Sequence, residues 1–122
     1  FTPVYGYTVT ALIDQCSMRD EYDALMKACA ELYPLLEEAA PGTGSYILPN
    51  AFKRRFLITA NLRALIHLIN LRSADNAHFS VRRVALRMAN QMRQCLPDFA
   101  PYLFNATKEE WDTIEKQYFA VD

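Results

Sequence analysis

Apolar residues recur at intervals of three and four along much of this chain, which is the spacing of one face of an α-helix. The pattern predicts helices over residues 17–36, 61–71 and 76–95, and a last amphipathic helix that begins near Thr107. Pro34 lies inside the first of these helices and is expected to kink or split it, because proline removes a backbone hydrogen-bond donor. The predicted helices account for most of the chain.

The first ten residues have a different pattern. They are rich in β-branched and aromatic side chains, which favour a short strand, at Val4, Tyr5, Tyr7, Thr8 and Val9. The short apolar run over residues 52–59 fits a strand and a helix equally well. We therefore predict a helix-rich α+β fold in which long helices pack with a short sheet, and a single domain over residues 1–122.

The helix predicted over residues 61–71 is apolar around most of its circumference. Its polar residues Arg63, His67 and Asn70 fall within about 60° of one another and form one narrow stripe. Such a helix is typically buried by its neighbours, and a buried arginine needs an anionic partner. An anionic ligand or a distant acid of the N-terminal helix could serve. The simpler alternative is a solvated polar face on a half-exposed helix.

The distribution of charge also indicates an anionic partner for the middle of the chain. The 122 residues contain 13 Lys and Arg against 14 Asp and Glu, a net charge of −1, and 52% are hydrophobic. Residues 53–93, however, contain nine basic residues and one acid and carry +8, whereas the remainder has four basic residues and 13 acids and carries −9. The basic runs at Lys53–Arg55 and Arg82–Arg83 fit solvated faces or intersubunit salt bridges. No nucleic-acid-binding motif accompanies them, so we expect no nucleic-acid partner.

Several classes of protein are disfavoured by what the sequence lacks. Three widely spaced cysteines, with only His67 and His78 as nitrogen donors, indicate reduced thiols and neither a disulfide framework nor a metal site. No apolar run approaches the length of about 18 residues needed to cross a membrane, and no signal peptide opens the chain, so we expect a soluble cytoplasmic protein. The chain starts at Phe1 and not at Met, which indicates a processed N-terminus or part of a longer protein.

Three segments resemble the C-terminal half of flavin-dependent thymidylate synthases: residues 47–49 (Ile-Leu-Pro), 59–72 and 76–82. In that family, a Leu-Pro precedes an Asn-x-Arg that opens a long helix, the helix ends in Leu-Arg, and an Ala-Gln-x-Glu-Ile-Arg-like segment follows. The spacing from Pro49 to Asn61, Arg72 and Ala77 matches this pattern without a gap.

The resemblance implies a function and assigns residues to it. Asn61, Arg63 and His67 match positions that bind FAD. Arg72 matches the catalytic, substrate-binding arginine that contacts the uracil ring of dUMP. The family methylates dUMP to dTMP with FAD, NADPH and methylenetetrahydrofolate, and it forms homotetramers whose sites draw on several subunits.

This chain also departs from the family pattern. The family's Arg-His-Arg motif precedes the matching region and is absent here, and the arginine expected just before the Leu-Pro is replaced by residues 42–45 (Gly-Thr-Gly-Ser). The resemblance therefore implies a thymidylate synthase-like protein. The alternative is a catalytically degenerate domain that keeps the fold for oligomer assembly or for nucleotide or flavin binding.

Overall fold

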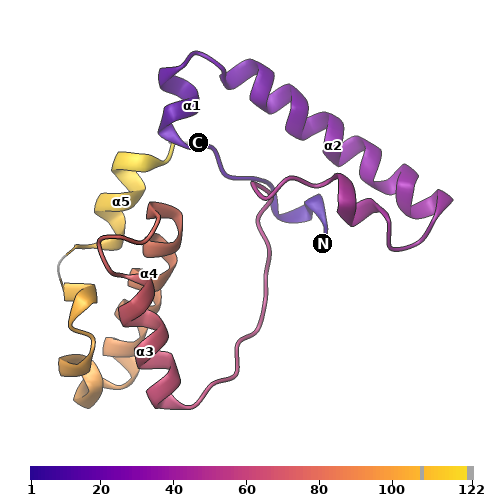
Figure 1. Cartoon of the computed structure of the whole chain (residues 1–122). Helices are drawn as coiled ribbons and strands as arrows, with labels where there is room; N and C mark the ends of the chain where they lie inside the picture. Colours follow the sequence, from indigo (N-terminus) through magenta and orange to yellow (C-terminus); the bar gives the residue numbers. More distant parts are fainter. Residues whose placement is uncertain (108, 121–122) are drawn as a thin grey trace. The chain divides into compact units, whose positions relative to one another are not determined.

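The computed structural model describes residues 1–107 and 109–120, and these residues form two compact units. The first unit comprises residues 1–57 with residues 119–120, and the second comprises residues 58–107 and 109–118. The first contains the α-helices α1 (Ala11–Gln15) and α2 (Arg19–Ala39) and the 3-10 helices η1 (Pro3–Tyr5) and η2 (Gly44–Ile47). The second contains α3 (Leu62–Arg72), α4 (Phe79–Cys95) and α5 (Trp111–Tyr118), with η3 (Pro97–Tyr102) and η4 (Asn105–Thr107) (Figure 1).

The prediction of an α+β fold with a short sheet is wrong. The described residues contain no strand, and their only β-type pairing is two isolated antiparallel bridges, Tyr7 with Phe52 and Thr10 with Phe119. The β-favouring opening segment is interrupted, because Pro3–Tyr5 forms a 3-10 turn and Gly6 has a φ of 67°. Residues with high β-propensity form a strand only where another strand pairs with them, and neither bridge extends into a ladder.

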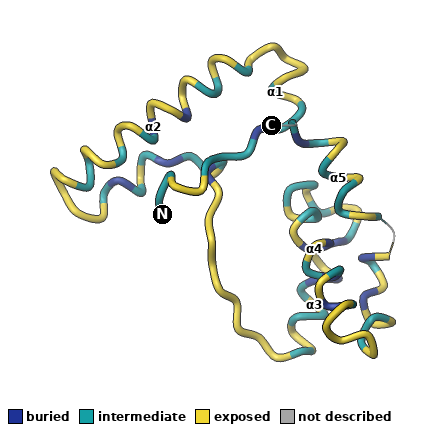
Figure 2. Tube along the Cα trace, turned by 180° about the vertical axis from the view of Figure 1, so that it is seen from behind, coloured by how far each residue is buried: buried dark blue, intermediate teal, exposed yellow. Residues whose placement is uncertain are grey.

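The first unit is organised around one face of α2. Met26 and Cys29 of this helix form a core with Leu48 and Phe52, against which Tyr7 packs. The helix runs through Pro34 as one element, so the expected split does not occur; Pro34 lies at an exposed position of the helix. Leu25, Leu32 and Leu35 of this helix remain exposed. Figure 2 shows exposed residues along the length of α2.

The second unit is a small helical assembly in which α4 is central. It packs against α3, α5 and η3, and its buried residues include Leu86 and Ala89. The largest fully buried side chains among the described residues are Ile69 of α3, Leu103, and Ile114 of α5. The last helix starts later than predicted, at Trp111, and Thr107 belongs to η4.

Helix starts in the second unit follow from local chemistry. Asn61 is the N-cap of α3, and its side-chain Oδ1 accepts a hydrogen bond of 2.9 Å from the N–H of Ala64. His78 is the N-cap of α4, where Nδ1 accepts from the N–H of Ser80 at 3.3 Å. Side-chain acceptors at this position satisfy amides that have no partner within the helix. The helices predicted over residues 61–71 and 76–95 are confirmed.

Cys16, Cys29 and Cys95 are free thiols among the described residues. Among the described residues, no helix combines the length and the apolar character that crossing a membrane requires.

Candidate functional site

The four residues assigned by resemblance all lie on α3 or at its start, and all four are exposed. The segment that leads into the helix, residues 53–60, has no regular secondary structure and is exposed throughout (Figure 2). The cap fixes the start of α3, since the amide of Ala64 is held by Asn61. The Nδ2 group of Asn61 has no hydrogen-bond partner among the described residues, and so it can donate to a ligand.

Arg63 and His67 lie one turn apart on the exposed face of α3. Among the described residues of its own unit, the guanidinium of Arg63 has no ion-pair or hydrogen-bond partner. The exposed face continues with Leu71, whose side chain is 51% exposed. The prediction that this helix is buried on nearly all sides is therefore wrong for the chain as described: its buried residues are Ile69 and Asn70.

Asn70 does not belong with the other members of the predicted polar stripe, because it is a buried structural residue. Its Nδ2 donates to the carbonyl oxygen of Tyr102 at 2.7 Å, and its Oδ1 accepts from the N–H of Asn105 at 3.3 Å. The Asn105 side chain in turn donates to the carbonyl of Asn70 at 2.9 Å. These bonds attach the segment containing η3 and η4 to α3.

Arg72 lies in the last turn of α3, where a cation is favourable beside the helix C-terminus. It is nine residues beyond Arg63, which places it about half a turn around the helix and about 14 Å along the axis. The structure thus brings Arg63 and His67 together and leaves Arg72 at a separate position on the same helix.

Part of the basic middle segment is used within the chain. One terminal nitrogen of the Arg83 guanidinium donates to both carboxylate oxygens of Glu115, at 3.1 and 3.2 Å. A guanidinium nitrogen of Arg82 lies 3.6 Å from a carboxylate oxygen of Glu109. Arg93 donates to the carbonyl of Ala106 at 2.7 Å. Both side chains of the Arg82–Arg83 run are therefore half-buried in this fold and lie beside acids from the C-terminal segment.

The run at Lys53–Arg55 has different surroundings. The guanidinium of Arg54 lies 3.5 Å from the centre of the Phe1 ring, and that of Arg55 lies 5.1 Å from the Tyr5 ring. Cations over aromatic faces are attracted by the ring quadrupole. Two of the three cations in this run therefore contact the N-terminal residues of their own unit.

A cavity of about 380 Å³ lies beside Arg63. It is lined by Leu62, Arg63 and Ile66 of α3 and by Phe99 and Tyr102 of η3. Phe99 and Tyr102 were not among the residues predicted from the sequence to belong to a site. The one sequence signal for a role of Phe99 and Tyr102 is that both aromatic residues occur close to Pro97 and Pro101.

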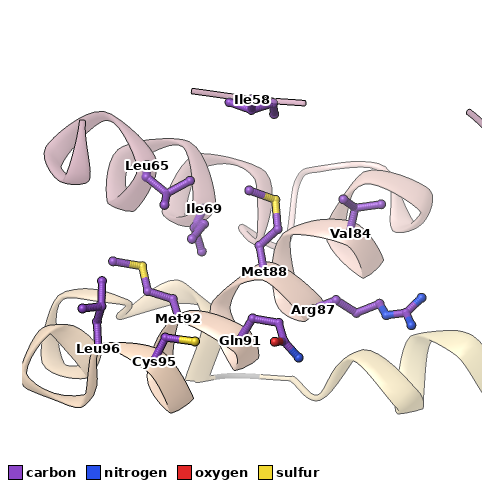
Figure 3. Close-up of a pocket in the computed structure, with 10 residues that line it drawn as sticks. All are labelled: Ile58, Leu65, Ile69, Val84, Arg87, Met88, Gln91, Met92, Cys95 and Leu96. Atoms are coloured by element: carbon purple, nitrogen blue, oxygen red, sulfur yellow. The ribbon is translucent and has the colours of Figure 1, made fainter. Parts of the chain in front are cut away.

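A larger groove of about 640 Å³ lies along the other side of α3, between this helix and α4 (Figure 3). Its lining is mainly apolar, with Leu65 and Ile69 from α3 facing methionines of α4. The polar lining residues are Arg87 and Gln91, and the Arg87 guanidinium lies 4.8 Å from the ring of Trp111. None of the four assigned residues lines this groove. Among residues 1–107 and 109–120, no three His, Cys, Asp or Glu side chains are grouped to hold a metal ion.

Comparisons with known proteins give a consistent result. The profile of the Thy1 family, described as thymidylate synthase complementing protein, matches residues 4–98. A UPF0159 protein of Thermoplasma acidophilum is 31% identical over 101 residues, which cover 81% of this chain and 20% of that protein. Flavin-dependent thymidylate synthases of Geobacter sulfurreducens and Pyrococcus furiosus are 31% and 33% identical over 65% and 61% of this chain.

The matching regions are a minor part of the relatives. They span 35% of the Geobacter protein and 32% of the Pyrococcus protein. No solved structure matches the chain at a significant level. The family profile nevertheless covers most of the sequence, including the whole of α3, and the chain therefore belongs to the Thy1 family of thymidylate synthase complementing proteins.

Proposed function

We propose that this chain contributes the flavin-binding helix of a flavin-dependent thymidylate synthase. The observation that carries the proposal is Arg63, an exposed arginine without a partner among the described residues of its unit, one turn from His67 and two residues from Asn61 on α3. A guanidinium that the fold leaves free is suited to a phosphate group.

The residues of α3 suit the roles that the resemblance implies. Arg63 would bind the diphosphate of FAD, and the free Nδ2 of Asn61 would donate a hydrogen bond to the same cofactor. His67, on the same exposed face, is a further contact for the flavin. When bound beside these residues, FAD would supply the hydride for methylation of the nucleotide, with NADPH as the reductant of the flavin and methylenetetrahydrofolate as the source of the carbon.

Arg72 is the proposed substrate-binding and catalytic residue. An arginine remains protonated across the working pH range, and so a fixed positive charge here would favour the anionic form of the uracil ring of dUMP. Its distance from Arg63, about 14 Å along the helix, supports separate positions for cofactor and nucleotide.

The complete activity is a property that we assign to the whole protein and not to α3 alone. The chain spans about a fifth to a third of the length of the relatives described above. The Arg-His-Arg motif is absent from it. We propose that other segments or other copies complete the site, with the homotetramer implied by the resemblance as the arrangement.

The test is flavin binding by the purified protein. FAD should shift the thermal unfolding midpoint upward, and Arg63→Ala should weaken FAD binding by at least tenfold through loss of a charge-assisted contact. Lys116→Ala is the matched control, since this cation is exposed on α5 and lies outside the proposed site. Absence of any FAD binding by the wild-type protein would contradict the proposal.

A catalytically degenerate domain used for assembly is the second candidate. The exposed apolar residues Leu25, Leu32 and Leu35 of α2 favour it, since they offer a surface for another copy. Sedimentation and FAD titration of Arg63→Ala and Leu32→Glu distinguish the two. The enzyme proposal expects Arg63→Ala to lose FAD binding at an unchanged mass, whereas assembly without a ligand site expects Leu32→Glu to dissociate the copies and Arg63→Ala to have no effect on FAD binding.

A further inference from the structure

The cavity beside Arg63 combines a cation with two aromatic rings. Phe99 and Tyr102 of η3 stand opposite Leu62 and Ile66 of α3, and their ring centroids lie 6.2 Å apart with a 41° angle between the planes. The cavity volume of about 380 Å³ is at the small end of the range of roughly 300–1,000 Å³ for ligand pockets. A single ring system with its attached phosphate suits this size better than a whole dinucleotide.

The aromatic wall is held in place by the fold. The carbonyl oxygen of Tyr102 accepts a 2.7 Å hydrogen bond from the buried side chain of Asn70. The next residue, Leu103, is fully buried, and its N–H donates to the carbonyl of Ala100 at 3.1 Å. The Tyr102 side chain itself remains 59% exposed. Its backbone is therefore fixed while its ring is free to contact a ligand, which lowers the entropy lost on binding.

The chemistry of the lining defines the ligand. A guanidinium binds phosphate oxygens, aromatic rings stack on the faces of planar heterocycles, and the aliphatic residues cover the edge of such a ring. We propose that Arg63, Phe99 and Tyr102 form a subsite for a nucleoside phosphate, with the phosphate on Arg63 and the base against the two aromatic rings. The inference rests on the proposed function, in which the nucleoside phosphate is the adenosine phosphate portion of FAD.

The experiment measures binding of AMP to the purified protein by calorimetry, beside adenosine and ribose 5-phosphate. AMP carries both groups that the subsite recognises, and each of the other probes carries one. We expect AMP to bind more tightly than either. Tyr102→Ala should weaken AMP by roughly 5- to 150-fold, the usual effect of removing a stacking ring.

Variants separate the two halves of the subsite. Tyr102→Phe keeps the ring and should retain AMP binding, whereas Arg63→Gln should weaken AMP while leaving adenosine binding nearly unchanged. Phe104→Ala is the matched control: this side chain is 63% exposed close to the same segment but does not line the cavity. Thermal midpoints of all variants check that the fold is intact.

A parallel FAD titration distinguishes this inference from the proposed function. FAD binding that Tyr102→Ala does not change, or AMP affinity equal to that of ribose 5-phosphate, overturns the subsite and leaves the flavin proposal standing. AMP binding that depends on Arg63 and Tyr102, without FAD binding, supports the subsite and overturns the flavin proposal. No binding of AMP by the wild-type protein overturns the subsite.

Discussion

Polar residues on one face of α3 differ in their surroundings. Asn70 is buried and bound to the backbone of the following segment, while Arg63 and His67, on the same face but nearer the start of the helix, are exposed. Asn105 completes the attachment with two hydrogen bonds to Asn70. At the scale of single residues, this helix thus carries one buried polar side chain that holds the fold together and others that remain exposed.

Asn70 should be among the polar residues most important for stability. Asn70→Ala would leave the carbonyl of Tyr102 and the N–H of Asn105 without their partner in a partly buried environment, and we expect a loss of about 1–3 kcal/mol in the free energy of unfolding. Asn76→Ala, at an exposed position, should change it by less than about 0.5 kcal/mol. Urea unfolding followed by circular dichroism measures both. Equal effects of the two substitutions would contradict the structural role.

In the first unit, Tyr7 and Asp23 predict a dependence of stability on pH. The Tyr7 hydroxyl donates to one Asp23 oxygen at 2.7 Å, and Arg19 Nε donates to the other at 2.7 Å. The hydrogen bond from Tyr7, and then that from Arg19, lower the pKa of Asp23. A lowered carboxyl pKa stabilises the fold above the unfolded value of about 3.9, and this contribution is lost as the pH falls through the folded value.

Tyr7→Phe should therefore destabilise the protein at pH 6, and its difference from the wild type should shrink below about pH 4 as Asp23 becomes protonated. Urea titrations at pH 6 and pH 3 make the comparison. Tyr46→Phe, at a fully exposed position, is the control and should show no difference at either pH. A difference between Tyr7→Phe and wild type that stays constant with pH would contradict the role of Asp23.

At the scale of elements, α4 is the helix against which the other helices of the second unit pack. It packs against α3 on one side and α5 on another, and the contact with α5 includes the ion pair between Arg83 and Glu115. Phe79 of α4 also stacks on Tyr118 of α5, with ring centroids 4.6 Å apart and planes 7° from parallel. Two basic residues of α4 thus pair with acids of the C-terminal segment, Arg83 with Glu115 and Arg82 with Glu109, although these charges are far apart along the sequence.

A double-mutant cycle tests how strongly this ion pair couples the two helices. Arg83→Met and Glu115→Gln should show a coupling of about 0.5–1 kcal/mol in unfolding free energy, since Arg83 is half-buried but Glu115 is more exposed. High salt should reduce it. The pair Lys116–Asp112 on α5 is more exposed and should couple by less than about 0.5 kcal/mol. Equal coupling in the two cycles would contradict the role of burial.

At the scale of the whole molecule, the two units are joined through residues 53–60, which are exposed and lack regular structure. The segment contains three trypsin sites at Lys53, Arg54 and Arg55, whereas the other basic residues of the middle region lie in α3 and α4. Proteases require an extended, accessible backbone, and helices provide one only after local unfolding.

Limited trypsin digestion should therefore cut first at residues 53–55. Mass spectrometry of early products should show fragments ending there before any cut after Arg83 or Arg87. Replacing the three basic residues by glutamine should slow the first cleavage at least tenfold, without changing the thermal midpoint. An equally rapid first cut within α4 would show that the helix opens as readily as residues 53–60.

The helices were the part of the fold that could be predicted, because periodic apolar residues and a side-chain cap are local signals. Asn61 marks the start of α3, and the end of α4 follows from Pro97. The sheet was predicted wrongly because the β-favouring residues near Tyr7 have no strand beside them. Pro34 was expected to interrupt α2 and does not.

The candidate site was predictable in its residues but not in its surroundings. The order of Asn61, Arg63, His67 and Arg72 along the chain, together with the resemblance it supports, determines the family and the helix that carries these side chains. Their assigned roles stay predictions. Phe99 and Tyr102 could not be placed beside Arg63, since the two segments are more than 30 residues apart and meet only through tertiary packing.

The sequence by itself determined the helical segments, the family and the asymmetry of charge, because each of these depends only on local spacing or composition. Tertiary structure decided which polar side chains remain available. It buried Asn70 against Tyr102 and Asn105, paired Arg83 with Glu115, and left Arg63 facing a cavity. The physical reason is that a charge or an amide becomes structural only when packing brings a partner to it, and such partners are remote in sequence.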